Sequence, residues 1–115
     1  MVIISKELCQ MTNITASEAA KFTLEYYIIT SAITLEKSTI ITYGIEIHKI
    51  AYLSLELREI KSITDISTNE NKVRHLIKTL ANGHVTPTSL YDIIYDWVSE
   101  QKNQNNPCQT GPLMI

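Results

Sequence analysis

Two neighbouring polar residues, Glu46 and His48, are the first candidates for chemistry in this sequence. They are two positions apart in a run that alternates apolar with polar residues, and alternation along a β-strand places both side chains on one face. If the next strand runs antiparallel, Glu56 or Arg58 comes to lie opposite them. A histidine beside carboxylates can move protons or bind a metal ion, but charge pairs across strands are also ordinary on a solvated sheet face. Both interpretations of Glu46, His48 and Glu56 stay open on the sequence alone.

The other titratable residues form no constellation of a catalytic or metal-binding type. Asp92 and Asp96 are one helical turn apart, but they fall on the polar side of their predicted helix and have no third ligand. His75 is predicted on the solvent-facing side of a helix, and His84 in a turn. The chain has 3 glycines, and it has neither the Gly-x-Ser-x-Gly nucleophile motif nor a phosphate-binding loop. The sequence therefore predicts a protein that is not an enzyme, with no catalytic, cofactor-binding or metal-binding residues.

The elements that position these residues begin with a predicted sheet. Threonine, tyrosine and isoleucine, which favour strands, dominate the sequence from residue 23 to residue 60. We predict strands at about 23–35, 40–47 and 52–58, because the second and third segments alternate apolar with polar residues. The first segment has apolar residues on both faces, which indicates a bulge, a central strand or a second buried surface. Residues 61–66 are expected to connect the sheet to the helices.

Two amphipathic helices are predicted after the sheet. Ser67 and Glu70 have the spacing of a capping box, so the first helix is expected to begin at Ser67. It is expected to end at 82–83 (Asn-Gly), and 86–87 (Thr-Pro) then starts the second helix. The apolar residues recur at helical spacing, with Val73, Leu76, Ile77 and Leu80 in the first helix and Leu90, Ile93, Ile94, Trp97 and Val98 in the second. The predicted fold is α+β, a three-stranded antiparallel meander covered by a C-terminal helical hairpin.

The chain is expected to form one domain with two flanking segments. Its 115 residues, 44% of them hydrophobic, provide material for one core. We assign residues 23–100 to a single α+β domain, residues 1–22 to an irregular or partly helical arm, and residues 101–115 to a disordered tail. Cys9 and Cys108 make neither a disulfide framework nor a metal-ligand cluster. No secretion signal or membrane-spanning run is visible, so the expected location is the cytoplasm.

Several motifs along the chain resemble one protein family. They are residues 42–47 (Thr-Tyr-Gly-Ile-Glu-Ile), 66–67 (Ile-Ser), 72–73 (Lys-Val), 76–77 (Leu-Ile) and 85–87 (Val-Thr-Pro), followed by Leu90, Asp92, Ile93, Ile94 and Val98. Together they are similar to small Firmicutes-type proteins grouped as domain of unknown function 6514, over roughly residues 24–98. The resemblance implies a bacterial protein with the fold of that family. It implies no mechanism, because the family has no assigned activity.

The second predicted helix also bears on the choice of partner. A helix, a short turn and a second helix form the outline of a DNA-binding helix-turn-helix. However, Asp92, Asp96 and Glu100 make the second helix acidic, so it would repel phosphate groups, and the net charge of −2 adds no attraction. The sequence therefore argues against nucleic acid as the partner.

Tyr91 and Tyr95 lie one turn apart beside the apolar stripe of the second helix. They either widen the buried face or form an exposed aromatic edge of the kind found at protein interfaces. Together with the two-faced apolar character of the first strand, they predict a protein-interaction or regulatory module that forms homo-oligomers or binds a protein partner. Tyr91 and Tyr95 are the candidate interface. The alternatives are a nucleic-acid-binding regulator that uses the helical hairpin and a small metal-dependent enzyme.

Overall fold

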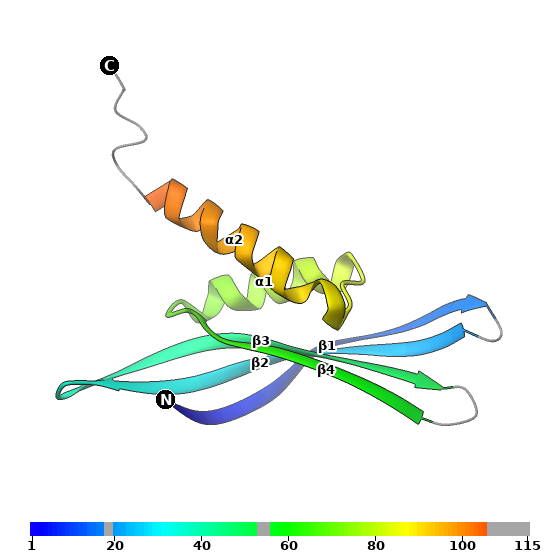
Figure 1. Cartoon of the computed structure of the whole chain (residues 1–115), viewed down its shortest axis with the longest axis horizontal. Coiled ribbons are helices and arrows are strands. Elements are labelled where there is room, and N and C mark those ends of the chain that lie inside the picture. Colours follow the sequence, from blue (N-terminus) through cyan, green and yellow to red (C-terminus); the bar gives the residue numbers. More distant parts are fainter. Residues whose placement is uncertain (18–19, 53–55, 106–115) are drawn as a thin grey trace, which may run out of the picture.

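The chain folds into a four-stranded antiparallel sheet with two helices on one face (Figure 1). The structure, a computed structural model, describes residues 1–17, 20–52 and 56–105. Its elements in chain order are β1 (Val2–Ser17), β2 (Ala20–Leu35), β3 (Ser38–Tyr52), β4 (Glu56–Ser67), α1 (Glu70–Asn82), the short 3₁₀ helix η1 (Pro87–Ser89) and α2 (Leu90–Asn105). The strand order is β1-β2-β3-β4, so β1 and β4 are the edges of the sheet. The predicted α+β class is confirmed.

The sheet has four strands rather than the predicted three, because the N-terminal segment is itself a strand. Residues 1–22, predicted as an irregular or partly helical arm, contain β1 and the start of β2. The register of β1 against β2 shifts at three places, Ile3/Ser5, Leu8/Gln10 and Thr15/Ser17. A shift of one residue exchanges the faces of all the side chains that follow, so β1 has no regular alternation in its sequence. The bulges therefore hide this strand from a periodicity analysis.

The prediction of a strand at 52–58 and of a connection at 61–66 is also wrong. β3 continues to Tyr52 and β4 begins at Glu56, so the predicted third strand contains the end of β3 and the start of β4. Leu53 and Leu55, which carry much of the alternation there, lie outside the described residues. The segment 61–66 belongs to β4, which bulges opposite β3 and has Asp65 at φ 56°. This irregular backbone is the reason why the segment lacks the pattern of a strand.

The core lies between the helices and the face of the sheet that they cover. Its buried residues are Leu24, Tyr26, Ile28, Ile45, Ile47, Val73, Leu76, Ile77, Leu80, Ala81, Leu90 and Ile94. The apolar stripe predicted for the first helix is thus the buried face of α1. The residues that alternate with this set on β2 and β3 point away from the helices. We call that side of the sheet the open face.

The helix ends differ from the prediction by a few residues. α1 begins at Glu70, with Asn69 as its N-cap, because the Asn69 side chain accepts a hydrogen bond from the Lys72 amide at 3.1 Å. The predicted cap, Ser67, instead accepts a hydrogen bond from the Asn69 amide. At the other end Gly83 has φ −88°, and the left-handed conformation falls on His84, with φ 51°.

Tyr26 ties the connection between the two helices to the sheet. Its ring is fully buried, and its hydroxyl donates a hydrogen bond to the Val85 carbonyl at 2.8 Å. Burial raises the pKa of Tyr26 to about 12. From this connection α2 slants away from the sheet, so its first turns lie near the strands and its C-terminal half lies farther off (Figure 1).

The end of α2 corrects the predicted tail. Residues 101–105, assigned to a disordered tail, continue the helix to Asn105, and residues 106–115 lie outside the described part of the chain. Among the described residues, no helix has the length and apolar character needed to cross a membrane.

Candidate functional site

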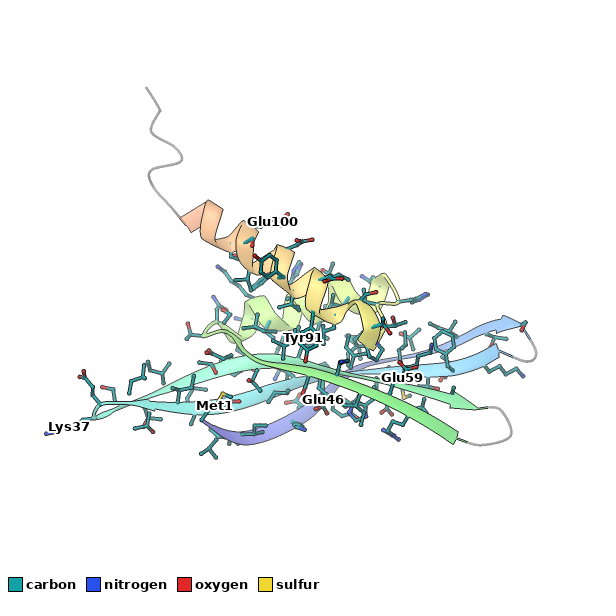
Figure 2. All side chains as sticks on the ribbon, in the orientation of Figure 1. Met1, Lys37, Glu46, Glu59, Tyr91 and Glu100 are labelled. Atoms are coloured by element: carbon teal, nitrogen blue, oxygen red, sulfur yellow. The ribbon has the colours of Figure 1, made fainter. Side chains whose placement is uncertain are left out.

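The polar residues singled out in the sequence meet on the open face of the sheet. Glu46 and His48 lie two positions apart on β3, and the His48 Nε2 atom is 2.7 Å from Glu46 Oε2. Arg58 of β4 joins them, with its guanidinium nitrogen 2.7 Å from His48 Nδ1. Figure 2 shows Glu46 near the middle of the sheet, on the side away from the helices. The side chain of Glu56 lies outside the described residues.

Three further residues from β1 and β2 complete this cluster. Lys6 of β1 donates a hydrogen bond to Glu46 Oε1 at 3.0 Å. Glu25 of β2 has its Oε1 atom 3.6 Å from the Arg58 guanidinium and accepts a hydrogen bond from the Tyr27 hydroxyl at 2.9 Å. The Tyr27 ring also packs against the His48 ring, with 4.7 Å between centroids. We call Lys6, Glu25, Tyr27, Glu46, His48 and Arg58 the open-face network.

The donors around His48 define its protonation pattern. A guanidinium group can only donate hydrogen bonds, so His48 Nδ1 accepts from Arg58. The proton of the ring is therefore on Nε2, where it is donated to Glu46. Burial alone raises the pKa of Glu46, but the hydrogen bonds from His48 and Lys6 outweigh burial and hold that pKa below its usual value. The carboxylate of Glu46 is thus ionised and bonded at both oxygens.

The network links the four strands of the sheet. Its six residues come from all four strands, and each carboxylate oxygen of Glu46, although the residue is only 6% exposed, has a cationic or N–H partner. A buried charge is tolerable when it is paired in this way. Among the described residues, no group of three or more His, Cys, Asp or Glu side chains is arranged to hold a metal ion. The network therefore joins the four strands through side-chain contacts across the open face.

The other predicted candidates lie apart from this network. Asp92 and Asp96 are exposed on α2, His75 is exposed on α1, and His84 is exposed at the end of α1. The structure brings none of these four together with Glu46.

Tyr91 and Tyr95 form an exposed edge of α2. Tyr91 is 51% exposed and Tyr95 is 75% exposed, so neither ring extends the core. The Tyr91 hydroxyl donates a hydrogen bond to the Ser62 carbonyl at 3.3 Å, and the Lys61 ammonium lies 5.3 Å from the centre of the Tyr91 ring. Tyr91 is therefore attached to the edge strand β4, whereas Tyr95 faces solvent.

A larger exposed apolar surface lies at one end of the sheet. It consists of residues 1–4 and residues 32–41, which the pairing of β1, β2 and β3 places side by side, with Val2 next to Ala32 and Ala32 next to Ile41. We call these two segments the apolar arm. The hairpin of β2 and β3 projects beyond the helices, so neither α1 nor α2 covers it (Figure 1).

The comparisons with known proteins agree with the family resemblance. Residues 5–100 match the model of a family of unknown function, DUF6514. The chain belongs to this family. No curated protein and no solved structure matches the chain.

For this DUF6514 chain, reasoning from the sequence finds Glu46, His48 and Arg58 but misses their partners Lys6, Glu25 and Tyr27. Lys6 lies in the hidden strand β1, 40 positions before Glu46, so only the four-stranded pairing brings the two together. The apolar arm is missed for the same reason. The signal that could have revealed it is the N-terminal run of residues 2–4 (Val-Ile-Ile), which are β-branched residues that favour strands.

Proposed function

We propose that this DUF6514 protein is a non-enzymatic interaction module that associates with a second copy of itself through the apolar arm. The observation that carries this proposal is the concentration of exposed apolar side chains in the arm. Of the twelve large apolar side chains that are exposed among the described residues, seven belong to the arm, namely Met1, Val2, Ile3, Ile4, Leu35, Ile40 and Ile41. Contiguous exposed apolar surface on a small protein marks a binding site for another macromolecule.

The charges of the arm favour a second copy as the occupant. Its only charged side chains are Glu36 and Lys37, neighbours of opposite sign at the hairpin turn. A twofold interface brings the same patch of both subunits together. Two such patches have no net side-chain charge to repel each other, and the Glu36 of one can face the Lys37 of the other.

The residues that follow the arm in β1 limit how far the association extends. Lys6 is bonded to Glu46 at 3.0 Å, and Glu7 forms an ion pair with Arg74 of α1 at 3.2 Å. Charged side chains on an edge strand oppose pairing with another strand. The proposed contact is therefore confined to the arm and excludes the middle of β1.

The proposal is tested by sedimentation velocity of the full chain over a range of concentrations. We expect the wild type to dimerise and Ile41→Lys to weaken the dimer about tenfold or more, because an ammonium group would be desolvated in an apolar contact. The matched control is Ile60→Lys, which changes an isoleucine of similar exposure on β4, outside the arm. This control should leave the dimer unchanged.

The same assay distinguishes the arm from the aromatic edge of α2. If Tyr95→Ala weakens the dimer while Ile41→Lys does not, the interface is the predicted Tyr91 and Tyr95 edge and the arm is the wrong surface. A wild type that stays monomeric at every concentration contradicts self-association altogether. Circular dichroism of each variant confirms that a loss of association is not a loss of folding.

A further inference from the structure

A groove lies between α1 and α2. Along this groove α2 slants away from the sheet (Figure 1). Its volume is about 250 Å³, and its lining residues are Leu76, Thr79 and Leu80 of α1 and Ile93, Asp96, Trp97 and Glu100 of α2. Leu76 and Leu80 are buried at its floor, whereas Ile93 and Trp97 are only partly covered. The groove is thus apolar inside and large enough to take a leucine or phenylalanine side chain.

The rim of the groove on the α2 side is acidic. Asp96 and Glu100 are one helical turn apart, both are exposed, and neither has an ion pair or a side-chain hydrogen bond within the described part of the chain. No Lys or Arg is among the residues that line the groove. Figure 2 shows Glu100 toward the end of α2 that lies away from the sheet. The rim therefore presents two unpaired negative charges beside an apolar cavity.

Trp97 adds a third recognition element. Its ring packs partly against the core and partly lines the groove, and its indole N–H has no hydrogen-bond partner among the described residues. An aromatic face of this kind attracts a guanidinium or ammonium group in addition to apolar side chains. Tryptophan is also one of the residue types enriched at the binding hot spots of protein interfaces.

We propose that this groove binds an amphipathic helical segment of a partner protein that carries an apolar anchor flanked by Lys or Arg. The anchor enters the cavity beside Trp97, and cationic residues one turn apart pair with Asp96 and Glu100. This is the mode in which a helix lays its apolar face into a groove. The surface is separate from the apolar arm, so the two proposals fail or succeed independently.

The experiment uses Trp97 as the reporter, since it is the only tryptophan of the chain. The full-length protein is titrated with a tryptophan-free peptide of leucine and lysine in a helical amphipathic pattern, and with a peptide in which glutamate replaces every lysine. We expect the lysine peptide to shift the Trp97 emission to shorter wavelength with saturation, and the glutamate peptide to produce no shift. Salt should weaken the binding, because the rim charges are exposed.

The variant Asp96→Asn/Glu100→Gln should bind the lysine peptide about fivefold more weakly, as expected for the loss of two exposed ion pairs. The matched control is Asp92→Asn/Glu59→Gln, which removes the same charge from exposed positions outside the groove. It should bind like the wild type. Equal weakening in both variants would show general charge attraction and overturn the proposal. So would an unchanged Trp97 emission on addition of the lysine peptide, which would mean that the groove does not take up the peptide.

Discussion

The two faces of the sheet differ in where they place charged side chains along the same strands. On β3, Ile45 and Ile47 are fully buried under the helices, whereas Glu46 and His48, which alternate with them, belong to the open-face network. The covered face excludes water with apolar side chains, and its stability comes from burial. The open face keeps charges, each paired with a neighbour from another strand, and it also buries Ile29 and Ile50. The apolar arm has neither a helical cover nor a network of paired charges, and its apolar side chains lie on both faces.

This difference separates the part of the sheet that the chain itself covers or pairs from the apolar arm, which we propose binds a second copy. In the middle of the sheet the helices cover one face, and the open-face network pairs the charged groups of the other. The apolar arm lies at the end of the same strands, and there the apolar pattern continues without a cover. Substitutions in the middle of the sheet test this contrast. The free energy of unfolding should depend on acid pH through the open face and on alkaline pH through the covered face.

The largest effect is expected at Gly44 of β3, because the bulged backbone of β4 lies directly against this residue. A Cβ atom at this position would collide with the Ile63 carbonyl oxygen and come within 2.7 Å of the Thr64 Cα. Both obstacles are backbone, which cannot rotate away as a side chain can. We expect Gly44→Ala to lower the free energy of unfolding by about 4 kcal/mol or more, measured by urea denaturation.

Gly83→Ala is the matched control for this change. A Cβ atom at Gly83 would meet nothing closer than the Thr79 carbonyl oxygen at 3.6 Å, and its φ of −88° suits any residue. The free energy of unfolding should change by less than about 1 kcal/mol. Similar losses in both variants would mean that β4 does not cross so close to Gly44.

Glu46→Gln should act on the open face and change the response of the protein to acid. The pKa of Glu46 is lowered from 4.5 in the folded chain, so its carboxylate stabilises the fold above that value. This contribution is lost as the pH falls through the lowered pKa. The variant should be less stable than the wild type by about 2 kcal/mol at neutral pH, because Lys6 and His48 lose their charged acceptor.

The acid side of the stability curve is the decisive measurement. The difference between wild type and Glu46→Gln should shrink as the pH is lowered below 4.5, since the wild-type carboxylate then becomes protonated. Glu59→Gln, at an exposed position of β4, should match the wild type at every pH. A difference that stays constant from neutral to acid pH would show that the charge of Glu46 does not stabilise the fold.

The extent to which the sequence predicts this molecule follows from how regular each segment is. The stripe of α1 and the alternation around Glu46 and His48 are unbroken, and both describe the structure. β1 and β4 contain bulges, and their local pattern therefore misleads about the strand count. The open-face network depends on pairing between distant segments, such as Lys6 with Glu46, which no local pattern contains. The apolar arm follows from the same long-range pairing.

The smallest effect is expected on the covered face, from Tyr26→Phe. The change removes one hydrogen bond, from the Tyr26 hydroxyl to the Val85 carbonyl, and keeps the buried ring, so the loss of stability at neutral pH should be about 1 kcal/mol.

The response of Tyr26→Phe to alkali separates the two faces. Because burial raises the Tyr26 pKa from 10 to about 12, the folded chain holds a proton that the unfolded chain releases, and the wild type loses stability as the pH rises through this range. Tyr26→Phe should lack this part of the alkaline loss and keep the acid response of the wild type, whereas Glu46→Gln should show the reverse. Urea denaturation of both variants at neutral, acid and alkaline pH measures this. If Tyr26→Phe lost stability in alkali as steeply as the wild type, the covered face would not be the source of that sensitivity. The predicted contrast, in which the apolar face loses stability in alkali and the charged face loses stability in acid, would then be wrong.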